Sequence, residues 1–266
     1  MITIPSPSSN SFILFDLFKV HYYSICIFIA ILFSLGTLLL LVKKLKLKIS
    51  VDFILDFTPL LIIFSVIGAR IYYCLGSLPF YINNPLEFFM INKGGISIQG
   101  AILGGIIFSL IYFKIKKAKF LPYADIFATV LPLGQALGRF GNYFNQEAFG
   151  LPVLNSPIGL FVDKQYRINY SDFDYFHPMF LYESLLNFLM FFILVFVLKK
   201  TANKIDGFVF YSYIVLYSII RLFLEFFRTD CTFFIFDIPF PAIFSLFSLI
   251  AGVFGILFCI KNKNVI

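Results

Sequence analysis

Residues 20–48 of the sequence read VHYYSICIFIAILFSLGTLLLLVKKLKLK. From Tyr22 to Val42 this stretch has no charged side chain, and an apolar run of roughly 20 residues is long enough for a helix to cross a bilayer. Four lysines follow at once, in residues 43–48, where they would lie among the lipid head groups. The stretch therefore predicts a membrane-spanning helix with a basic end.

The composition extends this prediction to the whole chain. Of its 266 residues, 60% are hydrophobic and only 13% are charged, whereas a soluble domain carries about 25% charged residues. The formal net charge is +7, but the basic residues occur in short clusters between apolar runs rather than on one soluble face. This pattern excludes a nucleic-acid-binding protein and is typical of the loops that orient a membrane protein.

Apolar runs that could span a membrane recur along the chain and predict the fold class. We expect an all-α polytopic bundle of about seven transmembrane helices, forming a single membrane domain over residues 1–266. The expected spans lie near residues 20–42, 51–75, 98–113, 120–137, 178–198, 207–226 and 239–260. Residues 138–177 are polar and contain two prolines, so we expect them to form a small external head.

Lysine clusters predict which way the helices run. They follow the first, third, fifth and seventh spans, at residues 43–48, 114–119, 199–204 and 261–263. All four clusters fall on one side of the membrane only if the spans number seven, so the charges support the span count independently. By the positive-inside rule this side is the cytoplasm. We therefore expect the C-terminus inside, and the N-terminus and the head outside.

Three arginines, Arg70, Arg139 and Arg221, lie toward the expected outer ends of their spans. An arginine near hydrocarbon costs at least about 2.5–3.5 kcal/mol. Each could snorkel to the head groups or pair within the bundle, as Arg221 can with Glu225 four residues on. Alternatively, the three could form a site for an anionic head group, because a planar guanidinium binds phosphate through two hydrogen bonds. Three arginines at a similar depth favour the anion site.

The densest polar cluster is GRFGNYFNQE, at residues 138–147. It places a cation, two amides and a carboxylate directly after an apolar run, and an ordinary polar helix end is the alternative explanation. Glycines on both sides of Arg139 would let the backbone approach a ligand closely. Further along, Tyr217, Arg221 and Glu225 are spaced four apart, which places them on one helix face. The four cysteines are scattered without metal-ligand spacing, so no metal or cofactor is expected.

The cluster at residues 138–147 resembles the signature of bacterial prolipoprotein diacylglyceryl transferases, which reads Gly-Arg-x-Gly-Asn-Phe-x-Asn-x-Glu. Only Tyr143 departs from it. Further segments resemble other motifs of this family in the family's order, at residues 20–23, 68–72, 94–100, 177–183 and 217–228. Together they extend over most of the chain. The family's seven spans, outward N-terminus and external head agree with the topology expected above.

The resemblance implies a reaction. Members of this family move the diacylglyceryl group of phosphatidylglycerol to the thiol of the lipobox cysteine in a prolipoprotein signal peptide. A thioether forms and glycerol phosphate leaves. The implied partners are phosphatidylglycerol, the prolipoprotein signal peptide and the lipid bilayer, and the implied location is the bacterial cytoplasmic (inner) membrane. The reaction needs no metal and no cofactor.

The resemblance and the side-chain chemistry together give the candidate site residues. The expected catalytic residues are Arg139, Arg221, Glu147, Tyr217, Gln99 and His177. The expected lipid-binding residues are Arg139, Asn142, Asn145, Arg70, Tyr23, Glu225, Gly94 and Gly95. Within this set, Arg139 and Arg221 would hold the leaving phosphate as its charge develops. Glu225 would orient Arg221.

Gln99 departs from the family, whose members usually carry histidine there. Glutamine forms hydrogen bonds but cannot take up a proton near neutral pH, so the thiol proton needs another acceptor. His177 is one candidate, and Glu147, expected to be partly buried, is another. Deprotonation assisted by the substrate is a further alternative. The departure leaves two functions open. One is an active transferase, and the other is a catalytically altered paralogue that binds anionic phospholipid or lipoprotein signal peptides without transfer. The retained polar residues favour the transferase, since such groups are costly in a membrane.

Overall fold

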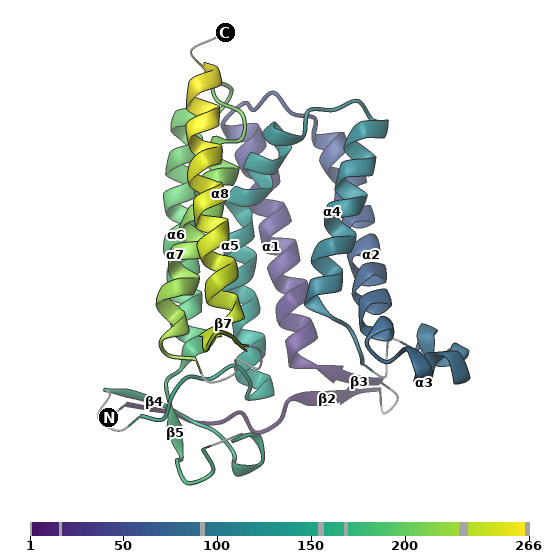
Figure 1. The fold of residues 1–266 in the computed structure, drawn as a ribbon, viewed down its shortest axis with the longest axis vertical. Helices are drawn as coiled ribbons and strands as arrows, with labels where there is room; N and C mark the ends of the chain where they lie inside the picture. The colour runs from purple at the N-terminus through teal and green to yellow at the C-terminus, as the bar shows by residue number, and fades with distance from the viewer. Residues whose placement is uncertain are drawn as a thin grey trace. The chain divides into compact units, whose positions relative to one another are not determined.

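In a computed structural model, which describes residues 2–15, 18–90, 94–153, 157–167, 170–228 and 234–263, the chain is mostly helical. Within these ranges seven helices are long and apolar enough to cross a membrane (Figure 1). They are α1 (Tyr22–Lys44), α2 (Val51–Leu75), α4 (Ile98–Ile115), α5 (Phe120–Asn145), α6 (Met179–Thr201), α7 (Phe208–Glu225) and α8 (Phe240–Lys263). The short helices are α3 (Leu78–Asn83), η1 (Pro85–Phe89) and η3 (Lys164–Tyr166). The predicted all-α, multi-pass membrane fold is confirmed.

Helix α5 is the one long helix whose bounds differ clearly from the apolar run. It continues to Asn145, eight residues beyond the expected end of the span at residue 137. The apolar run stops there because the side chains become polar, but polar side chains do not break a helix, and neither does an isolated glycine. Arg139, Asn142 and Asn145 therefore lie on the last two turns of α5 rather than in the head.

The helices group into two compact units. Lys48–Phe120 form one, the α2–α4 unit, and Met1–Leu47 with Leu121–Ile266 form the other, the five-helix unit. The sequence predicts a single membrane domain instead. The division arises because, among the described residues, α2 and α4 make nearly all of their helix contacts with each other.

Glycines bring α2 and α4 into close contact within the α2–α4 unit. A side chain at Gly100 would meet the backbone of Gly68 and Ala69, and one at Gly104 would meet the backbone of Phe64. Such contacts are possible only where small residues let two backbones approach. The four-residue spacing of Gly100 and Gly104 is thus explained by helix packing, as the sequence favours.

Helix α5 is the most buried span of the five-helix unit. Near its start, the buried Asp125 carboxylate accepts hydrogen bonds from the backbone N–H groups of Gly207 (2.7 Å) and Phe210 (2.8 Å). These are unpaired donors at the beginning of α7, which a carboxylate satisfies well. One side chain on α5 therefore fixes the start of α7.

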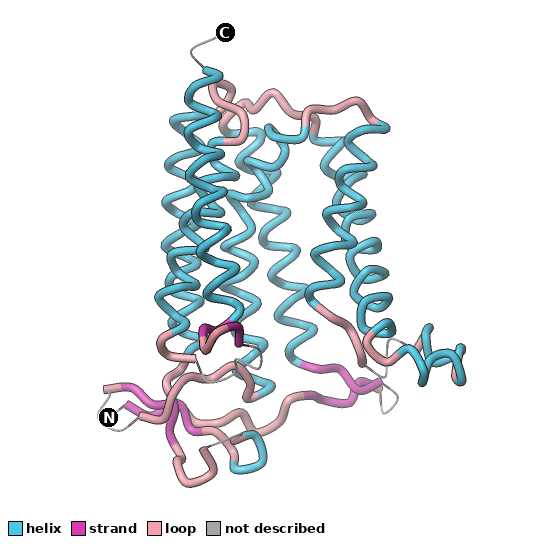
Figure 2. The backbone as a smooth tube through the Cα atoms, viewed as in Figure 1, coloured by secondary structure: helices cyan, strands magenta, loops and turns pink. Residues whose placement is uncertain are grey.

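Short strands gather at one end of the five-helix unit, where α1, α6 and α8 begin (Figure 2). Strand β4 (Ile158–Phe161) pairs in parallel with β1 (Ile2–Ile4) and antiparallel with β5 (Tyr175–Phe176), and the hairpin β2 (Ser11–Leu14)–β3 (Phe18–His21) leads into α1. A second short pair is β6 (Phe234–Ile235) with β7 (Ile238–Pro239). The head has a small core of its own, formed by Phe149, Leu160, Val162, Phe176 and Phe180.

The ends of the helices differ in charge within this unit. The lysines of residues 43–46, 199–204 and 261–263 lie in or just after the last turns of α1, α6 and α8, at the end opposite the strands. The end that carries the strands also carries the last turns of α5 and α7, and with them Arg139 and Arg221. The unit therefore has one basic end and one end that combines arginines, amides and carboxylates.

Candidate functional site

The last turns of α5 hold a continuous chain of polar contacts. Arg139 Nη1 donates to Asn142 Oδ1 at 3.2 Å, and Asn142 Nδ2 donates to Glu147 Oε1 at 2.9 Å. The amide of Asn145 also donates to Glu147 Oε1, at 3.3 Å. Arg139, the two amides and the carboxylate of the predicted cluster therefore do meet, and both amides donate to Glu147.

Glu147 lies in the turn after α5 and is exposed. The expectation that it is partly buried is wrong, because the chain turns outward directly after Asn145 and carries the side chain beyond the helices. No hydrogen bond reaches its second oxygen, Oε2, from the described residues. The Glu147 carboxylate is thus held on one oxygen and open to a substrate on the other.

Glu183, near the start of α6, joins two arginines. Its Oε2 pairs with Arg139 Nε, and its Oε1 pairs with Arg228 Nη1 at 2.7 Å. The Glu183 side chain is only 6% exposed, and a buried carboxylate is tolerated when cations and hydrogen bonds compensate its lost hydration. Three segments of the chain, α5, α6 and the residues after α7, are joined at this one carboxylate. We call Arg139, Glu183 and Arg228 the arginine–glutamate cluster.

Neither Glu183 nor Arg228 was among the predicted site residues. Arg228 would be exposed if the chain simply left the membrane after α7, but its side chain is only 12% exposed. The head covers it, because Gly150 and Arg228 form a β-bridge and Leu151 N–H donates to Phe227 C=O at 2.9 Å. A signal for both residues was present, since Glu183 and Arg228 end two of the segments that resemble family motifs.

One face of α7 carries the other predicted side chains. Arg221 Nη2 lies 3.0 Å from Glu225 Oε2, so the predicted pair is confirmed. Tyr217 stacks on Tyr213 one turn earlier, with ring centroids 5.8 Å apart. Within the described part of the chain, the buried Arg221 Nη1 has no hydrogen-bond partner. Arg221 therefore keeps a donor that an anionic ligand could use.

The glycines on either side of Arg139 serve helix packing rather than approach to a ligand. A side chain at Gly141 would collide with the ring of Tyr23, and one at Gly138 would crowd Ile27. Both partners lie on α1, so these glycines let α1 pack closely against α5. As a result, the Tyr23 ring lies directly against the helix turn that carries Arg139 and Asn142.

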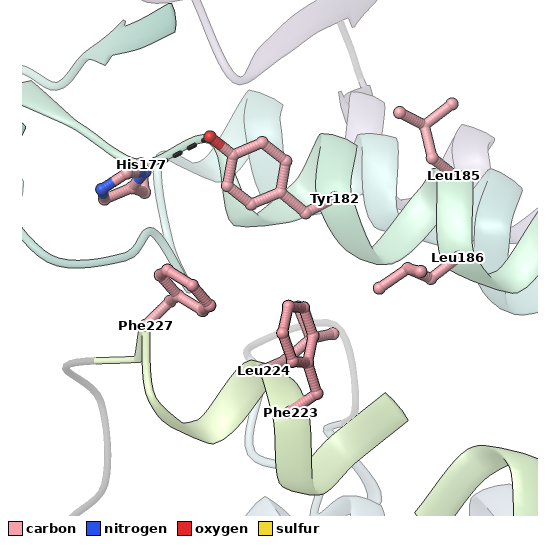
Figure 3. A pocket seen from close by; sticks show the side chains of 7 residues that line it. All are labelled: His177, Tyr182, Leu185, Leu186, Phe223, Leu224 and Phe227. Carbon is pink, nitrogen blue, oxygen red and sulfur yellow. Dashed lines mark hydrogen bonds between the residues drawn. The ribbon is translucent and has the colours of Figure 1, made fainter. Parts of the chain in front are cut away.

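His177 lines an apolar pocket beside α6 and α7 (Figure 3). The pocket measures about 370 Å³ and is otherwise lined by Tyr182, Leu185, Leu186, Phe223, Leu224 and Phe227. His177 Nδ1 lies 3.2 Å from the Tyr182 hydroxyl, and burial lowers the pKa of the imidazole below its ordinary value. Among the described residues, no hydrogen bond joins the imidazole to Arg139 or Glu147.

Arg70 belongs to the α2–α4 unit, where backbone carbonyls occupy its guanidinium group. Nη1 donates to the C=O groups of Gly94 and Gly95, both at 2.7 Å. Nε donates to Phe88 C=O at 2.9 Å and Nη2 to Glu87 C=O at 2.5 Å. Arg70 is 4% exposed, and both glycines have positive φ, near 87° and 80°, a conformation that glycine adopts without strain. These contacts favour a role in shaping the loop before α4 over direct contact with an anion.

Gln99 lies at the start of α4 in the same unit. Its Oε1 accepts a hydrogen bond from Ser97 Oγ at 2.5 Å, and the side chain is exposed. The oxygen is therefore occupied, and the NH₂ group is the part of Gln99 that remains to meet a ligand.

The fold and this site define a multi-pass helical membrane protein with arginines, amides and carboxylates gathered at one end of its spans. The chain belongs to the prolipoprotein diacylglyceryl transferase family, whose model matches residues 11–258. The family expected from the sequence is thus confirmed, and with it the enzyme class, transferase.

Named relatives agree with the family match. A protein of Clostridium perfringens (strain 13 / Type A) named phosphatidylglycerol–prolipoprotein diacylglyceryl transferase 1 is 37% identical over 245 residues, which is 92% of each chain. A Clostridium botulinum (strain 657 / Type Ba4) protein with the same name, unnumbered, is 40% identical over 74% of this chain and 78% of its own length. A similarly named Thermotoga petrophila protein is 44% identical over 64% of this chain and 58% of its own length.

Proposed function

We propose that this protein transfers the diacylglyceryl group of phosphatidylglycerol to the lipobox cysteine thiol of a prolipoprotein. The cysteine sulfur forms a bond to the terminal glyceryl carbon, and the bond from this carbon to the phosphate oxygen breaks. Glycerol phosphate leaves with the bonding electrons, while the thiol proton passes to a base. The observation that carries the proposal is the arginine–glutamate cluster, joined to Asn142 and Glu147 at the head end of the spans.

The leaving group explains why this site would contain arginines. Negative charge increases on the phosphate oxygen as the C–O bond breaks, so a cation already in place stabilises the transition state more than the substrate. Arg139 is held by Glu183 through Nε, which leaves much of the guanidinium fork for a phosphate. Arg221 contributes its unpaired Nη1, while Glu225 fixes the other nitrogen.

Glu147 is our candidate for the base. It is exposed, and the amides of Asn142 and Asn145 hold only one of its oxygens. A thiol becomes a good nucleophile only after it loses its proton, and the other oxygen of Glu147 is available to accept it. The remaining candidates are less suitable, because His177 faces an apolar pocket and Gln99 cannot accept a proton at neutral pH.

The other predicted residues would act around this centre. Tyr23, Tyr217 and Asn145 are candidates for hydrogen bonds to the glyceryl or phosphate oxygens. Within the α2–α4 unit, we propose that Arg70, Gly94 and Gly95 shape the loop before α4 and so position Gln99 at the start of this helix.

We further propose that the head end of the helices faces outward from the bacterial inner membrane. Three lysine clusters lie at the opposite end of the five-helix unit, as the positive-inside rule requires of the cytoplasmic end. A cysteine introduced at Gln165, an exposed head residue, should react with a membrane-impermeant maleimide in spheroplasts. Labelling only after membrane lysis would contradict this orientation.

An assay of the purified protein tests the reaction itself. The protein is incubated with phosphatidylglycerol and a lipobox peptide, and mass spectrometry follows the peptide. We expect the mass to rise by one diacylglyceryl group, with no change for a peptide whose cysteine is replaced by serine. An unmodified cysteine peptide, under conditions in which a related enzyme works, would contradict transfer. Binding of phosphatidylglycerol without transfer would instead support the altered-paralogue alternative.

A further inference from the structure

Glu147 lies between two residues with unusual backbone conformations. Gln146 has φ near 51° and Ala148 has φ near 53°. This left-handed region is unfavourable for residues other than glycine, and such conformations persist only where the surrounding structure holds them. Two backbone hydrogen bonds of the helix end provide part of the restraint on this turn, from Gln146 N–H to Tyr143 C=O and from Glu147 N–H to Asn142 C=O, both at 3.1 Å.

The side chain of Gln146 provides a further restraint. It is 8% exposed, and it forms two hydrogen bonds with one residue of the head. Gln146 Nε2 donates to Asp163 Oδ2 at 2.6 Å, and Asp163 N–H donates to Gln146 Oε1 at 2.7 Å. Both polar ends of the glutamine are thus used, and the partner lies 17 residues away in the sequence. We call this pair the Gln146–Asp163 latch.

Asp163 is itself held firmly in the head. It follows Val162, which is fully buried and donates its N–H to Asp174 C=O at 3.2 Å. The second carboxylate oxygen of Asp163, Oδ1, accepts a hydrogen bond at 3.0 Å from the hydroxyl of Ser6. Ser6 lies two residues after the end of β1. The latch therefore joins the end of α5 to the head sheet and, through Ser6, to the segment after the first strand.

We propose that the Gln146–Asp163 latch is a positioning device for Glu147, an inference that rests on the function proposed above. Without the latch, only the two backbone hydrogen bonds of the helix end hold the positive φ of Gln146, so this residue relaxes more readily to a right-handed conformation. Such a change rotates the next residue and separates Glu147 from the amides of Asn142 and Asn145. Gln146 and Asp163 touch neither reacting atom, so they act through the carboxylate that they place.

Two substitutions at Gln146 separate the latch from the backbone conformation. Gln146→Ala removes the latch and keeps the penalty of positive φ, whereas Gln146→Gly removes both. We expect Gln146→Ala to lower kcat by between about tenfold and a hundredfold, as displacement of a catalytic group does, with KM for phosphatidylglycerol little changed. Gln146→Gly should lower kcat less, because glycine adopts the positive φ without penalty. Asp163→Ala should cause a loss similar to that of Gln146→Ala, and the double variant Gln146→Ala/Asp163→Ala no further loss. Gln165→Ala, at an exposed glutamine of the same head, is the control and should retain wild-type activity.

A second set of variants, made in a Glu147→Gln protein, tests whether the loss of kcat depends on Glu147. In a Glu147→Gln protein, Gln146→Ala should cause no additional fall in kcat, whereas a general folding defect would still lower it. Wild-type kcat in Gln146→Ala would overturn the latch. An inactive wild-type protein would instead count against the proposed function, so the two failures are distinguishable.

Discussion

Glu183 is the single residue on which the arginine–glutamate cluster depends. Its buried carboxylate meets Arg139 and Arg228, which come from different segments of the chain. Losing one partner of a buried ion pair is more costly than losing an exposed pair, because the remaining charge has neither water nor a counter-charge. Substitution of Glu183 removes this carboxylate from two arginines at once.

We therefore expect Glu183→Gln to lower the free energy of unfolding by about 3–5 kcal/mol, the range for a broken buried pair. Denaturant unfolding of the detergent-solubilised protein measures the change. Asp172→Asn, at an exposed carboxylate of the head, is the control and should change stability by no more than about 0.5 kcal/mol. Wild-type stability in Glu183→Gln would show that this cluster does not hold the three segments together.

For single residues, the sequence predicts which side chains belong to the site better than it predicts their burial and their contacts. Arg139, Asn142 and Glu147 lie in one short run, so their meeting follows from local geometry. The burial of Arg228 could not be predicted in the same way, because the covering surface comes from the head, about 75 residues earlier in the sequence. The backbone carbonyl groups that bind Arg70 could not be predicted either, because they depend on the path of the loop before α4.

At the scale of elements, the contact between α1 and α5 determines where Tyr23 lies. This contact depends on Gly141, where an added Cβ atom would come within 2.6 Å of the tyrosine ring. The sequence identifies this glycine but not its purpose, because packing against a helix and approach to a ligand both require a missing side chain. The structure favours packing, as it does for Gly100 in the α2–α4 unit.

We expect Gly141→Ala to reduce the rate of transfer, because the new methyl group displaces Tyr23 from the turn that carries Arg139. The matched control is Gly36→Ala on α1, where an added Cβ would meet nothing within 4 Å. The control should retain activity and be slightly more stable, since alanine in a helix is favoured over glycine by about 0.5–1 kcal/mol. Equal rates for the two variants would argue against any role for the close contact.

At the scale of the whole molecule, hydropathy and charge alone predict most of the architecture. The starts of all seven long helices fall within two residues of the expected spans, because the apolar thickness of a bilayer sets the length of each run. The end of α5 could not be read in this way, since polarity marks where hydrocarbon ends and not where a helix ends. The division into two units could not be predicted from the sequence either, because it depends on which helices pack together.

We expect transfer to occur at the arginine–glutamate cluster and to require Arg139. The most direct measurement follows the mass of a lipobox peptide incubated with phosphatidylglycerol and either the wild-type protein or Arg139→Ala, with Lys164→Ala in the exposed part of the head as the control. We predict that wild type and control add the diacylglyceryl group, and that Arg139→Ala, still folded, does so at least about 100-fold more slowly. Transfer by Arg139→Ala at the wild-type rate would contradict the account.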